Sequence, residues 1–119
     1  MRFVWVGVAG AAGSIIRYLI GLSLGSTHFP WATLLVNLTG SFLLGFLVTW
    51  GLGRLPVAVT TPIAVGLLGG FTTFSAFAWE GLFMAGSGRG AMAAVYVLGS
   101  VGGGLLAALG GRLVGQAIL

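Results

Sequence analysis

Cysteine is absent from this sequence, and acidic residues and histidine are nearly so. The 119 residues include no Cys, one His and one Asp or Glu in total. The lack of Cys excludes disulfide bonds and thiolate metal sites. One His and one acid cannot supply a nucleophile, a base and an orienting group in any usual arrangement, so we expect a protein that is not an enzyme.

Charge is scarce and almost entirely of one sign. Charged residues make up 5% of the chain, and the net charge of +4 comes from five arginines against one acid. These arginines are spread from Arg2 to Arg112 and form no basic patch, so the sequence predicts no binding to nucleic acid. A lipid bilayer and anions are the expected partners.

Apolar residues dominate what is present. Hydrophobic residues fill 58% of the positions, and the mean hydropathy is +1.15. A helix needs about 20 apolar residues to cross a bilayer, and polar turns leave such stretches at 3–25, 31–52, 61–86 and 91–116. We therefore expect an all-α integral membrane protein whose four transmembrane helices form a single domain over residues 1–119.

The third stretch carries the run Gly69-Gly70-Phe71-Thr72-Thr73-Phe74-Ser75-Ala76-Phe77. Thr61 and Pro62 suit the first turn of this helix, which is then longer than one crossing requires. Paired glycines let the backbone leave helical geometry, and a bilayer tolerates such a break only where it is buried in protein or lines a polar cavity. The sequence predicts a break near Gly69 and makes this the place to look for function.

Glycine is abundant, with 23 residues. Four-residue spacings occur at Gly21 and Gly25, at Gly66 and Gly70, and at Gly99 and Gly103. This pattern favours close helix packing in membranes. Four helices are too few to enclose a polar path easily, so we expect at least two copies to associate.

The arginines give only a weak orientation signal. The expected topology places Arg2, Arg54 and Arg112 on the side that holds both termini, and Arg89, with or without Arg17, on the other. Because positive charge near the helix ends sets orientation, so small a bias predicts dual topology, in which copies insert both ways and pair as an antiparallel dimer.

Three polar side chains inside the apolar stretches need an explanation. Asn37 either makes an interhelical hydrogen bond or points its amide N–H at a permeating solute. Arg17 either snorkels to the interface or lines a wet anionic vestibule, which we prefer. Glu80 is the only candidate proton carrier, and pairing with an arginine is the structural alternative.

Aromatic rings alternate with hydroxyls in the run. Phe74 and Phe77 are three residues apart and share a helix face, with Thr73 and Ser75 beside them. The rings could simply pack in a core. However, aromatic edges are electropositive, and weak repeated contacts with an anion suit conduction.

On the fourth helix, Tyr96 and Ser100 are four residues apart, so both hydroxyls can face one seam. Packing explains such a pair equally well.

Three motifs together resemble the Fluc/CrcB family of fluoride channels over essentially the whole chain. They are Gly10-x-x-Gly13-Ser14-x-x-Arg17-Tyr18, Thr33-Leu34-x-Val36-Asn37-x-x-Gly40-Ser41 and the nine-residue run from Gly69 to Phe77. Gly104 stands where the family often has a further hydroxyl.

The resemblance implies an antiparallel dual-topology homodimer in the cell inner (plasma) membrane. It would hold two passive fluoride pores, each built from both subunits, that export fluoride from the cytoplasm and lower its toxicity. The implied fluoride path consists of the Phe74 and Phe77 ring edges, the Asn37 amide, and the hydroxyls of Thr73, Ser75, Tyr96 and Ser100, with Arg17 at a vestibule. The resemblance also implies a structural sodium ion at the dimer centre, held by the backbone carbonyls of Gly69 and Thr72.

Two other functions remain open at this point. A small multidrug-type proton-coupled antiporter also uses four short helices and dual topology, but it normally depends on an acid in its first helix, and this sequence has none there. A non-conducting assembly subunit would need only the glycine packing.

Overall fold

The computed structural model describes residues 1–25 and 28–119, which form helices and loops without a strand. Helix α1 (Arg2–Leu24) is the first span, and α2 (Trp31–Phe46) continues as η1 (Leu47–Gly51) to make the second. The third span consists of α3 (Val57–Thr61), η2 (Pro62–Leu68), α4 (Gly69–Phe71) and α5 (Phe74–Gly86), and the fourth is α6 (Gly90–Ala117).

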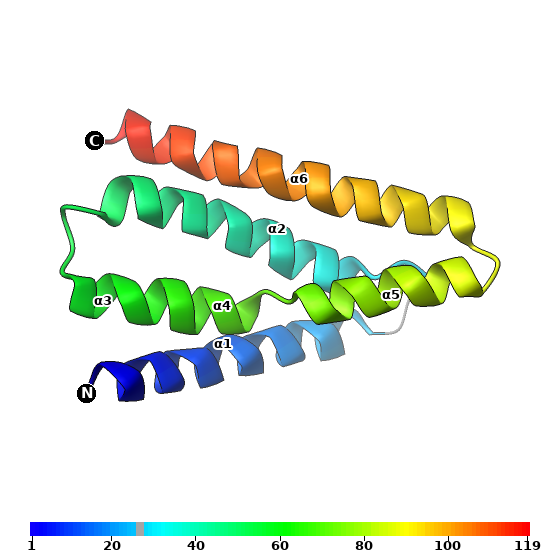
Figure 1. The fold of residues 1–119 in the computed structure, drawn as a ribbon, viewed down its shortest axis with the longest axis horizontal. Helices are drawn as coiled ribbons and strands as arrows, with labels where there is room; N and C mark the ends of the chain where they lie inside the picture. The colour runs from blue at the N-terminus through cyan, green and yellow to red at the C-terminus, as the bar shows by residue number, and fades with distance from the viewer. Residues whose placement is uncertain (26–27) are drawn as a thin grey trace.

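The four spans lie side by side as a bundle, with both termini at the same end (Figure 1). All four are long and apolar enough to cross a membrane. The chain is therefore a multi-pass membrane protein, and the four predicted spans are confirmed. Both termini also lie at one end, as the expected topology required.

The third span begins earlier than predicted. It starts at Val57, after Pro56, rather than at Thr61. Pro62 was expected in the first turn but lies inside the span, where the chain changes to the wider π turns of η2. Proline cannot donate an N–H to the regular helical ladder, so a change in hydrogen bonding at this position accommodates it.

The predicted break is present, but it lies three residues after the glycine that was expected to cause it. Gly69 has helical dihedrals, with φ −64° and ψ −37°. The chain leaves the helix at Thr72, with ψ 157°, and stays extended at Thr73, with φ −148° and ψ 121°. Figure 1 shows this as the thin connection between α4 and α5.

Gly70 serves close packing rather than the break. A Cβ at Gly70 would lie 2.5 Å from the carbonyl oxygen of Gly10, and one at Gly66 would lie 2.6 Å from that of Val6. Helix α1 can therefore approach η2 and α4 backbone to backbone, as small residues allow in membranes. The spacing of Gly66 and Gly70 is confirmed as a packing device.

The other glycine spacings have mixed outcomes. A Cβ at Gly103 would lie 2.9 Å from Leu38, so this glycine does pack against α2. Positions Gly21, Gly25 and Gly99 would meet nothing within 4 Å among the described residues. At Gly25 the reason for glycine is instead a φ of 67°, in the left-handed region where it ends α1.

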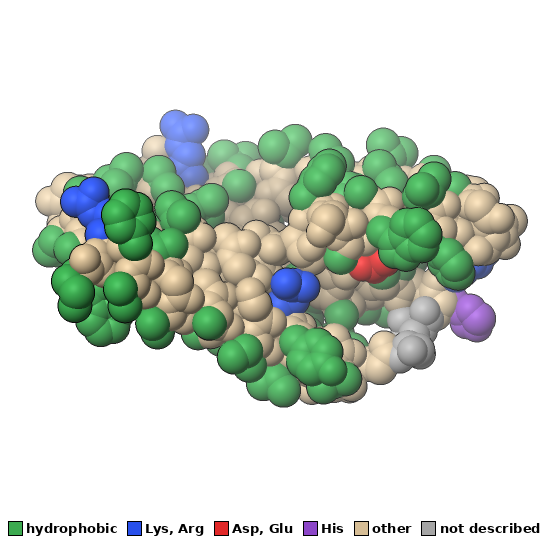
Figure 2. All heavy atoms as spheres, turned by 60° about the horizontal axis from the view of Figure 1, so that its bottom comes forward, with side chains coloured by type: hydrophobic (Ala, Val, Ile, Leu, Met, Phe, Trp, Pro, Cys, Tyr) green, Lys and Arg blue, Asp and Glu red, His purple; other side chains and the backbone are tan. Residues whose placement is uncertain are grey.

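Large apolar side chains cover the outside of the bundle. Leu98, Leu105 and Leu106 on α6 are among many that are mostly exposed. Figure 2 shows hydrophobic side chains distributed over a whole face with few charged groups between them. A lipid bilayer is the solvent that such a surface suits.

Candidate functional site

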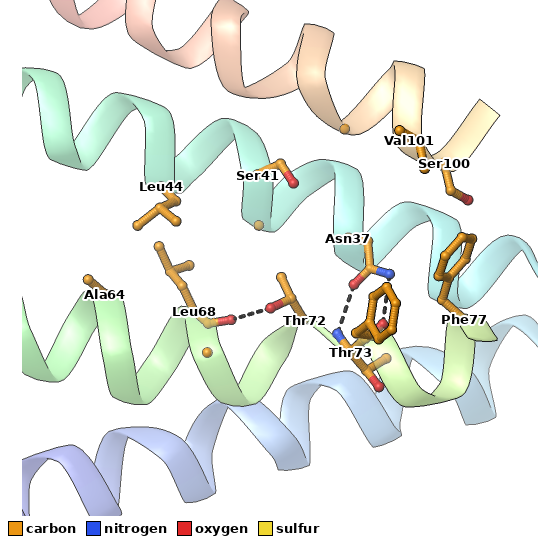
Figure 3. A pocket seen from close by; sticks show the side chains of 14 residues that line it. Asn37, Ser41, Leu44, Ala64, Leu68, Thr72, Thr73, Phe77, Ser100 and Val101 are labelled. Carbon is orange, nitrogen blue, oxygen red and sulfur yellow. Dashed lines mark hydrogen bonds between the residues drawn. The ribbon is translucent and has the colours of Figure 1, made fainter. Parts of the chain in front are cut away.

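A cleft of about 350 Å³ lies beside the break, between α2, the third span and α6. Figure 3 shows the side chains that line it. Its polar or aromatic lining residues are Asn37, Ser41, Thr72, Thr73, Phe74, Phe77 and Ser100. Five of the seven predicted fluoride-path residues, Asn37, Thr73, Phe74, Phe77 and Ser100, are therefore brought to one cleft.

Asn37 reaches from α2 to the break and pairs with Thr73 in both directions. Its Nδ2 donates to the carbonyl oxygen of Thr73 at 3.0 Å, and its Oδ1 accepts from the backbone N–H of Thr73 at 2.8 Å (Figure 3). The structural alternative from the sequence, an interhelical hydrogen bond, is thus present. A carboxamide has two N–H groups, so one of them remains for a second acceptor.

Two threonines terminate the helices on either side of the break. Thr72 donates through both its N–H and its hydroxyl to the carbonyl oxygen of Leu68, at 3.0 and 2.9 Å. Thr73 caps α5, because its Oγ1 accepts from the N–H of Ala76 at 3.2 Å. Such N-caps satisfy a backbone donor at a helix start that would otherwise be unpaired.

Two of the three phenylalanines of the run, Phe74 and Phe77, line the cleft together. Their ring centroids are 5.8 Å apart at an interplanar angle of 57°, and Phe77 is 5.3 Å from Tyr96 in a similar tilted contact. Phe74 is 79% exposed in the single chain. A ring this exposed is not part of the core of the chain.

Ser100 contributes an unpaired hydroxyl. Its Oγ is buried, yet it has no hydrogen-bond partner within the described part of the chain. Buried hydroxyls are normally paired, so this one is available to a ligand in the cleft.

Tyr96 and Ser75 lie outside the cleft lining. Tyr96 is completely buried, and its hydroxyl donates to Oε2 of Glu80 at 3.5 Å. Ser75 is exposed, with its Oγ 3.5 Å from the hydroxyl of Thr73. The hydroxyls of Tyr96 and Ser100, which were predicted to face one seam, therefore lie in different surroundings in a single chain. The first contacts Glu80, and the second lies at the cleft.

Glu80 is held by hydroxyls. The hydroxyl of Thr33 donates to its Oε1 at 2.6 Å, while Tyr96 approaches the other oxygen. An arginine was the partner expected for Glu80, and the Thr33 hydroxyl was not expected, although Thr33 begins the second of the three motifs. Both residues lie beside a second cleft of about 360 Å³, which also contains His28 and Arg89.

Arg17 links α1 to the third span just before the break, whereas Asn37 reaches the break from α2. Its Nε donates to the carbonyl oxygen of Gly70 at 3.2 Å. It also lines a cavity of about 230 Å³ together with Thr33, Thr73 and Ala76. The predicted vestibule arginine is thus adjacent to the break but outside the main cleft.

The family is decided by comparison with known proteins. The family model described as CrcB-like protein, Camphor Resistance (CrcB), matches residues 4–112. The chain belongs to the CrcB family. Members of this family include a protein of Moorella thermoacetica named Fluoride-specific ion channel FluC 2, which is 45% identical over 111 residues and 91% of each chain.

Two further relatives are similar over almost their whole length. The Fluoride-specific ion channel FluC 2 of Listeria monocytogenes is 42% identical over 121 residues, covering 100% of this chain and 94% of the relative. The Fluoride-specific ion channel FluC of Thermus thermophilus is 44% identical over 124 residues, covering 96% and 97%. The CrcB family assignment thus agrees with the resemblance drawn from the three motifs.

Proposed function

We propose that this protein is a fluoride-selective passive ion channel that lets fluoride leave the cytoplasm and so lowers its toxicity. The observation that carries the proposal is the cleft at the break, which an amide, hydroxyls and two phenyl rings line together in a chain whose relatives are named as fluoride channels. Such a channel needs no catalytic group.

The cleft offers donors to a small anion. Moving a carboxylate-sized ion into a low-dielectric medium costs on the order of 20 kcal/mol by an idealised Born estimate, and fluoride is smaller. The unpaired hydroxyl of Ser100 and the remaining N–H of Asn37 replace part of the lost hydration. Fluoride is the strongest hydrogen-bond acceptor among the halides, so such donors compensate it better than chloride.

The assembly belongs to the same proposal. Two copies would pair as an antiparallel dual-topology homodimer in the cell inner (plasma) membrane, with two pores that each use both subunits. The exposure of Phe74, Gly69 and Ser75 supports this, because these residues surround the break yet remain uncovered in one chain. Ser75, which is exposed in one chain, would then join the path beside groups of the second copy, whereas Tyr96 would contribute from inside its own chain.

A structural sodium ion at the dimer centre completes the proposal. In a continuous helix the carbonyl of Gly69 would accept from the N–H of Thr73, which here donates to Asn37 instead. Thr72 is itself extended, and the N–H of Ala76, which would donate to the Thr72 carbonyl in a continuous helix, donates to Oγ1 of Thr73 instead. Backbone oxygens released from a broken helix are hard donors that suit a hard cation, so Gly69 and Thr72 fit the ion.

The antiporter alternative has no support from the relatives, which are named as channels. Replacing the only acid tests it directly. A Glu80→Gln variant would abolish proton-coupled transport, whereas a passive channel would still confer fluoride resistance.

Efflux from liposomes tests the proposed channel. Purified protein is reconstituted into vesicles loaded with fluoride or with chloride, and release is followed with ion-selective electrodes. We expect rapid fluoride release, no chloride release, and loss of fluoride release in a folded Phe77→Ile variant. No fluoride release from the folded wild-type protein would refute the proposal.

A further inference from the structure

We propose that Asn37 is the positioning residue of the helix break. Its side-chain amide takes the place of the main-chain partners of Thr73, and this pairing leaves one N–H of Asn37 free for an anion in the cleft. The first part concerns the fold alone, while its consequence for ion selection rests on the proposed fluoride channel.

The pairing is reciprocal. Asn37 donates to the Thr73 carbonyl at 3.0 Å and accepts from the Thr73 N–H at 2.8 Å, so one side chain satisfies both polar groups of an extended residue. Thr73 lies in a bilayer-spanning stretch, where unpaired backbone groups are costly. Asn37 removes that cost at the residue where the third span leaves helical geometry.

The competing structure is a continuous helix. There the Thr73 N–H would return to the carbonyl of Gly69, four residues earlier. Asn37 diverts this donor, while Thr72 closes α4 on the carbonyl of Leu68. Loss of the Asn37 amide therefore favours either closure of the break or an unprotected Thr73 N–H.

The same pairing fixes which way round the amide lies. A backbone N–H can only donate and a carbonyl can only accept, so Oδ1 of Asn37 must face the first and Nδ2 the second. One lone pair of the oxygen is thereby used, and the second N–H remains free. An amide held this way keeps its oxygen at the Thr73 N–H and has a free donor for an anion.

The position of the rings depends on this contact. Thr73 caps α5 through Ala76, and Phe74 is the next residue after it. A shift at Thr73 therefore moves the start of the helix that carries Phe74 and Phe77. Asn37 thus positions the ring edges in addition to lining the cleft.

Magnetic resonance of full-length protein in bilayers, with isotope-labelled threonine and asparagine, tests the inference. Carbon shifts report whether Thr73 is extended or helical, and amide exchange reports its protection. In the wild type, Thr73 should be extended and protected, and only one of the two side-chain N–H groups of Asn37 should be protected. Equal, rapid exchange of both groups would overturn the inference without any substitution.

Two variants separate positioning from ion contact. In Asn37→Leu, Thr73 should become helical, or its amide exchange should rise about tenfold, the scale of one lost hydrogen bond. Asn37→Asp keeps an oxygen to accept from the Thr73 N–H, and its protonated form also donates to the Thr73 carbonyl, so at a pH that protonates the new carboxyl group Thr73 should stay extended and protected. The exposed Thr39→Val is the control on the same helix and should leave Thr73 unchanged.

The outcomes are distinct from those of the proposed function. An Asn37→Leu protein in which Thr73 stays extended and protected would overturn the inference, as would Asn37→Asp losing the break as fully as Asn37→Leu. Fluoride efflux is measured on the same samples, and Asn37→Asp should keep the break but lose efflux. A wild-type protein that releases no fluoride yet shows the predicted Thr73 behaviour would refute the channel and leave the positioning role intact.

Discussion

The Nε of Arg17 donates to the carbonyl oxygen of Gly70 at 3.2 Å, across a sequence separation of 53 residues. This contact joins the first span to the third just before the break, while Asn37 holds the other side from the second span. The break is therefore supported by two other spans of the bundle.

Replacing Arg17 with Gln should destabilise the protein. A hydrogen bond from a charged group is typically worth about 1.5–3 kcal/mol, whereas one between neutral groups is worth about 0.5–1.5 kcal/mol. The Nε2 of Gln is attached at the same side-chain position as Nε of Arg17, so Gln keeps the donor to Gly70 but loses the charge. We expect a lower thermal unfolding midpoint in detergent. Arg54→Gln is the control, since Arg54 is exposed at a loop and its substitution should have little effect. Equal midpoints for the two variants would argue against a supporting role for Arg17.

Gly111→Ala should be strongly destabilising. A Cβ at this position would overlap the carbonyl oxygen of Phe42, where α6 packs on α2. Overpacking in a tight interface typically costs about 1–3 kcal/mol. Gly7→Ala should be tolerated, because a Cβ there meets nothing within 4 Å of the described chain. Thermal unfolding of both variants measures the difference, and a tolerated Gly111→Ala would show that the helices can separate at no cost.

Ser100→Ala should lower fluoride transport without lowering the stability of the protein. The buried hydroxyl of Ser100 has no partner within the described residues, so its removal should leave stability unchanged or raise it by up to about 1 kcal/mol. Fluoride efflux should fall, because the cleft loses a donor. The exposed Ser23→Ala should leave efflux unchanged. Unaltered efflux in Ser100→Ala would remove this hydroxyl from the proposed path.

Thr33→Val should destabilise the protein through Glu80. The variant removes the 2.6 Å hydrogen bond to Oε1 and leaves a half-buried carboxyl group with one fewer donor. The expected cost is about 1.5–3 kcal/mol, as for other hydrogen bonds to charged groups. A double-mutant cycle with Glu80→Gln measures the coupling, and additive effects would show that the two residues act independently.

The sequence predicted the number of spans and the existence of the break because long apolar stretches and polar turns are local signals. It predicted a break near Gly69 and attributed it to the glycine pair, whereas the extended residues are Thr72 and Thr73. Glycine's freedom suggests a break, but here it permits contact with Gly10, and the site of the break is set by Asn37 on another helix.

The candidate site was predicted in part for the same reason. The family resemblance implied one path for Asn37, Phe74 and Phe77, and in the structure all three line the same cleft. The pairing of Glu80 with Thr33 joins residues 47 positions apart, and nothing in local spacing indicates it. Contacts between spans require the packing angle and depth of each helix, which a single sequence does not provide.

The central claim is that the protein conducts fluoride passively and selectively. Current across a planar bilayer containing the protein, with a fluoride gradient and symmetric chloride and pH, measures this most directly. For a passive fluoride channel, the reversal potential should shift by about 59 mV for each tenfold fluoride gradient, the value for a monovalent ion. Added chloride or proton gradients should leave the reversal potential unchanged. A reversal potential that follows chloride or protons, or folded protein that passes no fluoride current, would contradict the account.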